Sequence, residues 1–382
     1  MKTHFLKHSK FLLLVTFLWL LLSFNLSSCS TNFGDPDYKY RIPEQTSDGW
    51  ETDSLSSVGM SQDLIVEMIN EIQRETYENI NSILIIKDGK LVLEEYFNSY
   101  NRDRKHRCYS VTKTISSLLI GIAIEKNLIK GVNENITTFF PEYEDIDWSS
   151  GKSDIKLHHI LSMTTGLDWS EVGIPYSSSR NTHSQMYDSD DWARFVLERP
   201  MKFMPGERFN YNTGTSNMLA HIIKNSTGWQ ADDFTEENLF KPLGISGFDW
   251  FKDPNGYPST GGTQGGISLR PRDMAKIGYL ILNNGRWKDS QILPASWIEE
   301  TTKIHTNYGT AGYGYQLWSY SSKDTKGRKF EFFSAQGYGG QFIFVLPGQN
   351  MVVVSTAFNP DDQKKWFQSF DMLQKFILPS VK

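Results

Sequence analysis

Two apolar segments typical of β-hairpins lie far apart in the chain. Residues 82–87 and 90–96 are runs rich in Ile, Leu and Val that flank the dipeptide Asp88-Gly89. An Asp-Gly pair between two such runs is a strong hairpin signal, because both residues tolerate the left-handed backbone of a tight turn. Residues 341–346 and 351–356 form a similar pair around Pro347-Gly348. We therefore expect strands from both ends of the folded chain.

The chain between these hairpins has mainly helical periodicity. Apolar residues recur at helical spacing over residues 110–125, 216–226 and 272–282. This order of elements predicts an α+β fold, with an antiparallel sheet built from both chain ends and flanked by helices. A mainly helical lobe is expected to be inserted at roughly residues 120–250.

The N-terminal segment has the pattern of an export signal. Lysines at positions 2, 7 and 10 precede the apolar run 11–22, and small polar residues follow it. This combination is typical of a signal peptide. The run is shorter than the roughly 20 apolar residues that span a bilayer, and no stop-transfer pattern follows it. We therefore expect export rather than a permanent transmembrane helix.

Leu26-Ser27-Ser28-Cys29 resembles the lipobox of bacterial lipoproteins, in which the cysteine is lipidated and begins the mature chain. The polar residues that follow suit a tether between lipid and domain. The predicted organisation is a signal peptide over 1–29, a tether over 30–48 and one folded domain over 49–382. We expect an exported lipoprotein that is anchored to a membrane through Cys29 and faces the periplasm or the cell exterior.

Composition and charge exclude some classes of protein. Of 382 residues, 39% are hydrophobic and 22% charged, as in chains that bury a large core. The net charge of −5 gives no electrostatic reason to expect a nucleic-acid partner. Lipidation of Cys29 would leave Cys108, the second of two cysteines, without a disulfide partner. We expect Cys108 to be a buried structural residue; a thiol nucleophile is the alternative.

Ser110 and Lys113 are candidates for chemistry, because they begin the strongest helix predicted after the signal peptide. Their spacing places hydroxyl and amine on one helix face, within hydrogen-bond reach. A lysine whose proton affinity is lowered by burial can accept the serine proton, and a helix N-terminus favours the developing negative charge. Ser-x-x-Lys also occurs at 149–152 and 153–156, in polar stretches without an apolar helix behind them. The spacing alone leaves open an ordinary helix-capping role for Ser110.

Four separated segments carry a family resemblance. They are Ser110-Val-Thr-Lys113, Leu161-Ser-Met-Thr-Thr-Gly166-Leu167, Pro205-Gly206-Glu-Arg-Phe209-Asn-Tyr211 and Gly265-Gly266-Ile-Ser-Leu-Arg-Pro-Arg-Asp273-Met-Ala-Lys276. In this order they resemble the serine β-lactamase-related family, which includes class C β-lactamases, esterases, D-amino-peptidases and 6-aminohexanoate-dimer hydrolases. The resemblance extends from about Trp50 to the C-terminus. It implies a β-lactamase/transpeptidase-like fold and a serine hydrolase in which Ser110 is acylated.

The second motif of that family is Tyr-x-Asn, whose tyrosine acts with the first motif's lysine as general base and then as acid toward the leaving group. Tyr211 occupies the tyrosine position, so the resemblance implies that Lys113 and Tyr211 handle the proton of Ser110. Because an ordinary tyrosine pKa of roughly 10 is too high for a base at neutral pH, we expect the Lys113 ammonium to lower the pKa of Tyr211. Thr213 stands where the family has Asn; it is a predicted substrate contact that offers a hydroxyl but no amide.

The third motif, usually Lys-Thr-Gly or His-x-Gly, is replaced by Ala335-Gln336-Gly337. The cation that assists a substrate carboxylate is missing, so efficient β-lactam hydrolysis is not expected. Because a glycine lets substrate lie against the strand backbone, we predict substrate contacts at Gln336 and Gly337, and an oxyanion hole made by the backbone N–H groups of Ser110 and Tyr338. A tight strand entry without chemistry is the alternative.

Residues 176–192, which include Tyr187, are either a loop that covers the cleft, with Tyr187 contacting substrate, or a solvated connection. Segments 209–214 and 337–341 are most similar to the esterase and 6-aminohexanoate-dimer-hydrolase branch.

Two hypotheses on function follow. The first is a serine hydrolase that cleaves a small-molecule or peptide-like ester or amide through an acyl-enzyme, and it needs no cofactor. The sequence has no metal-binding motif, Gly-x-Ser-x-Gly elbow or phosphate-binding loop, and we expect no metal. The second is a catalytically silent ligand-binding or sensor lipoprotein with the same fold, which the altered motifs favour. Retention of Ser110, Lys113 and Tyr211 together opposes it, since a binder has no need of all three.

Overall fold

The computed structural model describes residues 38–262, 264–360 and 362–382, which belong to one compact unit. The predicted signal peptide, Cys29 and the first part of the predicted tether lie outside the described residues. Residues 38–48, predicted as the end of the tether, instead pack on the domain. The Tyr38 hydroxyl donates to Glu95 at 2.5 Å, and the Tyr40 hydroxyl donates to the Val92 carbonyl at 2.8 Å. The predicted domain boundary at residue 49 is therefore corrected, because the folded unit includes Tyr38.

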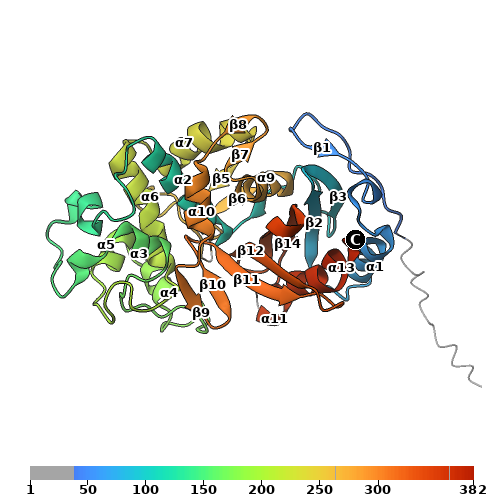
Figure 1. Ribbon diagram of the computed structural model, residues 1–382. Coiled ribbons are helices and arrows are strands. Elements are labelled where there is room, and N and C mark those ends of the chain that lie inside the picture. Colours follow the sequence, from blue (N-terminus) through green and yellow to red (C-terminus); the bar gives the residue numbers. More distant parts are fainter. Residues whose placement is uncertain (1–37, 263, 361) are drawn as a thin grey trace, which may run out of the picture. The chain divides into compact units, whose positions relative to one another are not determined.

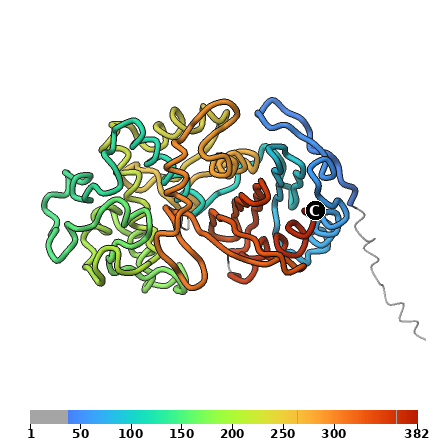
Figure 2. Tube along the Cα trace, in the orientation of Figure 1, coloured from blue at the N-terminus to red at the C-terminus, as the bar shows by residue number. Residues whose placement is uncertain are grey.

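A nine-stranded sheet with strands from both ends of the described chain lies at the centre of the unit (Figure 1 and Figure 2). One pair, β1 with β3, is parallel, and the other seven pairs are antiparallel. The spatial order of the strands is β1 (Glu51–Thr52), β3 (Lys90–Tyr96), β2 (Ile80–Lys87), β14 (Met351–Ala357), β13 (Gln341–Leu346), β12 (Lys329–Gly337), β11 (Trp318–Lys323), β10 (Ala311–Tyr313) and β9 (Thr306–Tyr308).

Both predicted hairpins are present in this sheet. Strands β2 and β3 pair across Asp88-Gly89, where both residues have positive φ angles of 53° and 79°. Strands β13 and β14 pair across a short 3₁₀ turn at Pro347–Gln349. The remaining described strands form a small sheet of β4 (His106–Arg107), β6 (Ile267–Leu269) and β5 (Asp249–Trp250), and a hairpin of β7 (Arg286–Trp287) and β8 (Ser290–Gln291).

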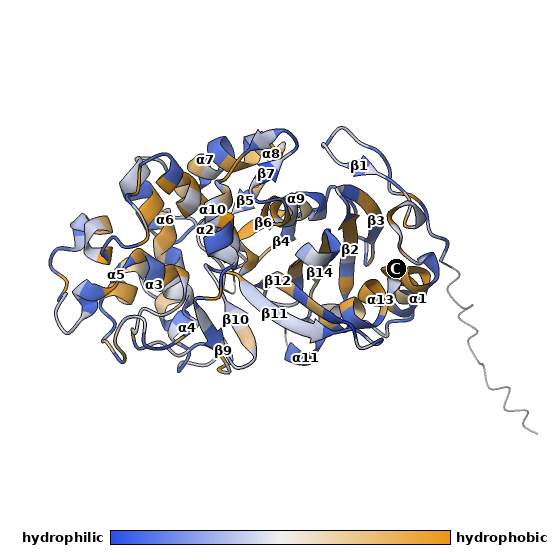
Figure 3. Cartoon of the chain, in the orientation of Figure 1, coloured by the Kyte–Doolittle hydropathy of each residue, from blue (hydrophilic) through white to orange (hydrophobic). Residues whose placement is uncertain are grey.

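The middle strands of the central sheet, β2, β13 and β14, are buried on both faces. Leu84 and Ile86 of β2 belong to one hydrophobic core, whereas Ile83 and Ile85 belong to the other. Strands covered on both sides have nearly continuous apolar sequences, which is why the hairpin strands show no polar alternation; Figure 3 shows the hydrophobic residues that recur along β2 and β3. Helix α9 covers the first face so closely that a Cβ at its Gly278 would lie 2.6 Å from the side chain of Ile343 in β13.

The described helices confirm the three predicted from periodicity, which correspond to α2, α6 and α9. Their bounds are α1 (Gln62–Gln73), α2 (Val111–Glu125), α3 (Leu157–Leu161), α4 (Thr182–Tyr187), α5 (Trp192–Leu197), α6 (Thr213–Thr227), α7 (Ala231–Thr235), α8 (Lys241–Leu243), α9 (Pro271–Leu282), α10 (Ala295–Thr302), α11 (Gln363–Trp366), α12 (Gln368–Met372) and α13 (Leu378–Ser380). Within the described ranges, no helix combines the length and hydrophobicity that crossing a bilayer requires.

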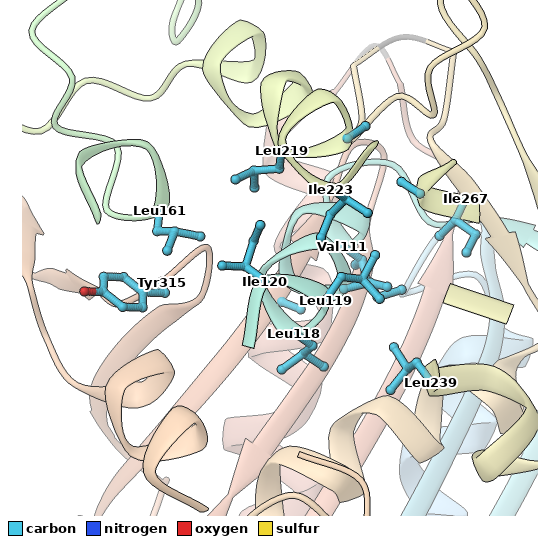
Figure 4. Close-up of a cluster of buried hydrophobic side chains, with 14 of the residues drawn as sticks. Val111, Leu118, Leu119, Ile120, Leu161, Leu219, Ile223, Leu239, Ile267 and Tyr315 are labelled. Atoms are coloured by element: carbon cyan, nitrogen blue, oxygen red, sulfur yellow. The ribbon is translucent and has the colours of Figure 1, made fainter. Parts of the chain in front are cut away.

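A mainly helical lobe, as predicted, is inserted between β4 and β5 and is built around α2. Every residue from Val111 to Ala123 is buried, which is the pattern of a core helix that is covered on all sides. Figure 4 shows Leu119 and Ile120 of α2 among Leu219 and Ile223 of α6. This packing fixes the start of α2, where Ser110 lies, against the helical lobe and the sheet.

Candidate active site

Ser110 lies at the N-terminal end of α2, directly after a residue with strained backbone. Tyr109 has a φ of +48°, which is uncommon for a residue other than glycine. Its N–H donates to the Gly265 carbonyl at 2.7 Å, and the N–H of Cys108 donates to the Ile267 carbonyl at 2.7 Å. These contacts hold the chain in the turn that presents the Ser110 hydroxyl.

Lys113 is the direct partner of Ser110. Its Nζ lies 2.9 Å from Ser110 Oγ and 3.4 Å from the Thr260 carbonyl oxygen. The lysine is 2% exposed, and burial lowers its pKa from 10.5 to about 8 despite the opposing attraction of Glu171. The predicted proximity of hydroxyl and amine is confirmed, and a pKa of about 8 leaves about a tenth of Lys113 neutral at pH 7.

The other two Ser-x-x-Lys sequences, at 149–152 and 153–156, lack this arrangement. Lys152 donates its ammonium to the Leu197 carbonyl at 2.6 Å, and Ser149 is exposed. Lys156 begins a short helix and is partly exposed. Of the three Ser-x-x-Lys sequences, the one at Ser110 has a serine–lysine hydrogen bond.

Tyr211 lies beside this pair, just before α6. The Lys113 Nζ is 5.3 Å from its ring centroid, and the ring stacks on Trp318 at 6.2 Å. Burial and the Glu171 carboxylate raise the pKa of Tyr211 well above 10, and a hydrogen bond with Ser110 opposes them only partly. Our expectation that Lys113 would lower the pKa of Tyr211 is therefore wrong, because burial penalises the phenolate. A tyrosine with such a raised pKa keeps its proton at neutral pH.

Glu171 is a residue that the sequence prediction missed. Its buried carboxylate accepts hydrogen bonds from the side chains of Trp169 at 2.8 Å, Tyr176 at 3.0 Å and Thr213 at 2.6 Å, and from the Thr213 backbone N–H at 2.9 Å. The one signal in the sequence was an acidic residue in the aromatic stretch that follows the Leu161–Leu167 motif. Four donors hold a negative charge close enough to affect both Lys113 and Tyr211.

The same contacts correct the role predicted for Thr213. Its side chain is fully buried at 0% exposure, and its hydroxyl is committed to Glu171. A side chain in this position positions the carboxylate and does not face open space. We therefore assign Thr213 a contact with Glu171 in place of the predicted contact with substrate.

A glycine-rich loop completes the surroundings of Ser110, and it too was missed as part of the site. A Cβ added to Gly261 would lie 2.9 Å from Lys113 Nζ and 3.0 Å from Ser110 Oγ. At Gly262 it would lie 2.0 Å from Nε2 of His183, a buried histidine whose Nδ1 has no hydrogen-bond partner among the described residues. Backbone therefore approaches the reacting groups where any side chain would collide with them.

The end of strand β12 lies against the segment that carries Ser110. A Cβ at Gly337 would lie 2.3 Å from the Cys108 carbonyl oxygen, so only glycine fits there. The Tyr338 ring lies 5.5 Å from that of Tyr109, and its hydroxyl donates to the Pro360 carbonyl at 2.9 Å. The oxyanion-hole role of the Ser110 and Tyr338 backbone amides and the substrate contact at Gly337 stay predictions that suit this arrangement.

Gln336 and Tyr187, both predicted to contact substrate, lie on different elements, β12 and α4. Gln336 is half-buried on β12 and donates its amide to the Tyr320 hydroxyl at 2.8 Å. Tyr187 ends α4, and its ring packs 5.4 Å from Trp192 and 6.4 Å from Phe251. These ring contacts do not reach Ser110, so the predicted contact of Tyr187 with substrate stays a prediction.

The segment before α4 contacts the site through Tyr176. Its hydroxyl donates to Glu171, and its ring lies 5.6 Å from Tyr338 and 5.1 Å from His183. Of the two interpretations of this stretch, a covering loop agrees better with these contacts than a solvated connection.

Cys108 is fully buried, and burial raises the pKa of its thiol to about 12. A thiol that stays protonated in an apolar environment is a poor nucleophile. The prediction of a structural cysteine is confirmed. Among the described residues, no cluster of His, Cys, Asp and Glu could hold a metal ion.

The family model described as Beta-lactamase matches residues 81–368. A 6-aminohexanoate-dimer hydrolase of Paenarthrobacter ureafaciens is 22% identical over 320 residues, which cover 80% of this chain and 79% of the relative.

Solved structures show the same fold. One is EstCE1, described as a hydrolase with promiscuous acyltransferase activity, with a TM-score of 0.67, 15% identity and coverage of 84% of this chain and 100% of that chain. Another is simvastatin synthase from Aspergillus terreus, with a TM-score of 0.63, 14% identity and coverage of 83% and 98%.

Proposed function

We propose, from the premise that the chain belongs to the β-lactamase family of serine hydrolases, that Ser110 forms an acyl-enzyme with an ester or amide substrate. The observation that carries this proposal is the 2.9 Å contact between Ser110 Oγ and the Nζ of a buried Lys113. The similarity to a 6-aminohexanoate-dimer hydrolase and the fold shared with EstCE1 support the esterase and linear-amide branch of the family.

The acylation step uses the three side chains in order. Neutral Lys113 accepts the Ser110 proton while Oγ attacks the substrate carbonyl carbon. Backbone N–H groups at Ser110 and Tyr338 hold the oxyanion. Tyr211 then donates its proton to the leaving oxygen or nitrogen, the C–O or C–N bond breaks, and Lys113 returns a proton to Tyr211.

Deacylation reverses the proton path. Water attacks the Ser110 ester and gives its proton to neutral Lys113. As the ester C–O bond breaks and the carboxylic acid leaves, Lys113 returns that proton to the Ser110 oxygen. A raised pKa keeps Tyr211 protonated over the working range, so its role is proton donation rather than proton abstraction. Ala335-Gln336-Gly337 in place of Lys-Thr-Gly or His-x-Gly leaves the third motif without a charge for a substrate carboxylate.

The direct test is labelling by a fluorophosphonate probe, followed by intact-mass measurement of the full-length chain. We expect one adduct in the wild type and in Ser149→Ala, and none in Ser110→Ala. Ser149 is a matched control because it begins another Ser-x-x-Lys sequence on the exposed surface. Absence of an adduct on the folded wild type would remove the hydrolase mechanism and favour a ligand-binding role.

We also propose that the domain is held at a membrane by lipid on Cys29, on the periplasmic or outer side. The support is the sequence of residues 2–29 and the start of the described unit by Tyr38. Nine residues span at most about 30 Å, so the domain would stay close to the bilayer. Cells given radiolabelled palmitate should label the wild type but not Cys29→Ala; labelling of both proteins would contradict this anchor.

A further inference from the structure

A cavity of about 300 Å³ opens next to Tyr211, on the side of the helical lobe. This volume is at the lower end of those of small-molecule sites. Tyr211 lines the cavity and also lies beside Ser110 and Lys113. Tyr211 is therefore shared by the cavity and the catalytic centre, and the acylation step makes no use of the other cavity walls.

The cations of the cavity differ in their partners. Lys202 and Arg208 both line it. The Lys202 ammonium is 2.8 Å from the Asp168 carboxylate, which neutralises much of its charge. Arg208 forms no ion pair or side-chain hydrogen bond with any residue that the structure describes, and its guanidinium lies 5.1 Å from the Phe203 ring centroid. Arg208 therefore offers its donors to a ligand.

One carboxylate also lines the cavity, that of Glu171. Both of its oxygens are already occupied, because Trp169 and the Thr213 N–H donate to one and Tyr176 and the Thr213 hydroxyl donate to the other. Glu171 thus does not compete for Arg208, and no ion pair joins the two. Arg208 is thus the lining cation whose charge no described carboxylate neutralises, and its end of the cavity favours an anionic ligand.

The walls between Arg208 and Tyr211 are apolar and aromatic. Phe203, Phe209 and Tyr308 line the cavity, and Tyr308 is 51% exposed at its rim. Exposed aromatic surface beside an unpaired cation suits a group with an apolar arm that ends in an anion.

The position of Tyr211 sets which part of the substrate enters. In the proposed mechanism Tyr211 donates its proton to the leaving group, so the leaving group lies on its side of the scissile bond. Arg208 precedes Tyr211 by three residues, and three residues span at most about 10 Å. Because this bounds the distance between the two Cα atoms, we expect a short arm between the anion and the breaking bond.

We propose that this cavity binds a leaving group that carries a carboxylate on a short apolar arm, and that Arg208 binds that carboxylate. The inference rests on the proposed function and names its substrate class. It places the anion-binding cation in the segment that precedes Tyr211, whereas the third motif has Gln336 and no charge.

Two butyrate esters test this selectivity. One has 3-(4-hydroxyphenyl)propanoate as its leaving group and the other has the corresponding propanamide, so the two phenols differ in charge but hardly in size or acidity. For the wild type we expect kcat/KM to be about tenfold or more higher for the carboxylate, from charge-assisted hydrogen bonds to Arg208. Arg208→Gln should remove this preference by lowering kcat/KM for the carboxylate ester to the value for the amide ester.

Arg286→Gln is the matched control, because Arg286 is also an exposed arginine but lies on β7 and does not line the cavity. It should keep the full preference. Equal kcat/KM for the two esters in the wild type, or a preference that persists in Arg208→Gln, would overturn the inference while the hydrolase function stands.

Binding to Ser110→Ala separates this inference from the proposed function. We expect 3-phenylpropanoate to bind this variant in a calorimetric titration, and the double variant with Arg208→Gln to lose that binding. If neither ester is cleaved but this binding pattern holds, the hydrolase proposal fails and the anion site stands. Absence of carboxylate binding to Ser110→Ala would overturn the anion site.

Discussion

Lys113→Met should abolish hydrolysis and at the same time stabilise the folded protein at neutral pH. A lysine pKa lowered from 10.5 to about 8 means that the folded state disfavours the charged form by about 3 kcal/mol, at about 1.4 kcal/mol per pH unit. Met removes this cost but also removes the hydrogen bonds to Ser110 and Thr260, each of which contributes about 1 kcal/mol. The net gain expected at pH 7 is about 1 kcal/mol.

The pH dependence of this difference follows from the sign of the shift. The cost is fully present below the folded-state pKa of about 8, where both states bind the proton, and it disappears as the pH rises above 10.5, where neither does. The stability of Lys113→Met relative to the wild type should therefore fall by about 2.5 kcal/mol between pH 7 and pH 10. Urea unfolding at both pH values measures it.

Lys276→Met is the matched control, because Lys276 is also fully buried but has the carboxylate of Asp273 at 3.5 Å. Its replacement leaves that buried carboxylate with less compensation and should destabilise the protein at pH 7. The account of Lys113 as a strained catalytic base would be refuted if Lys113→Met were clearly less stable than the wild type at pH 7. A difference that did not change with pH would refute it as well.

Three further outcomes follow from the same geometry. kcat/KM should rise with pH through an apparent pKa of about 8 and fall tenfold per pH unit below it, because acylation needs neutral Lys113. The pH dependence of kcat/KM for a neutral ester measures this. A flat profile between pH 6 and 8 would contradict it. Tyr211→Phe should lower kcat by about 10²–10⁴ for a substrate with a poor leaving group, because Tyr211 protonates the leaving atom. For an activated phenyl ester the loss in kcat should be much smaller. Equal losses for both substrates would contradict that role. Gly261→Ala should slow fluorophosphonate labelling, because its Cβ would lie 2.9 Å from Lys113 Nζ. Gly256→Ala, whose Cβ would meet open space, should be labelled at the wild-type rate. Equal labelling rates for the two variants would exclude the close approach of Gly261 to Lys113.

The elements that the sequence predicted well are those determined by local pattern. The Asp88-Gly89 turn has the positive φ angles that its residue types favour, and the apolar residues of 110–125 form the buried helix α2. The hydrogen bond between Ser110 and Lys113 follows from helical spacing alone. The sheet between distant chain segments was predictable because its apolar hairpins lie at both ends of the chain.

The parts that were not predicted depend on long-range contacts. Glu171 reaches the site because Thr213, 42 residues later, binds its carboxylate, and Gly261 reaches it through the Thr260 carbonyl that accepts from Lys113. No local pattern in either segment encodes such a contact. The pKa of Tyr211 was predicted in the wrong direction for the same reason, because its burial and the charge of Glu171 are properties of the packed structure.

The segment 38–48 shows the limit of compositional reasoning. Its polar residues suggested a tether, but the Tyr38 and Tyr40 hydroxyls bind β3. The Arg272 guanidinium lies 2.8 Å from the Glu44 carbonyl oxygen and 3.0 Å from the Asp48 carboxylate. Polar residues can attach a segment to a domain through hydrogen bonds without an apolar stripe.

The measurement that tests the central claim most directly is the trapping of the acyl-enzyme during turnover. The full-length protein is mixed with 4-nitrophenyl butyrate, quenched with acid within the steady state, digested and mapped by mass spectrometry. We predict a butyryl group on the peptide that contains Ser110, and its absence in Ser110→Ala. Turnover of the ester with the butyryl group on another residue, or with no acylated peptide and undiminished activity in Ser110→Ala, would contradict the account.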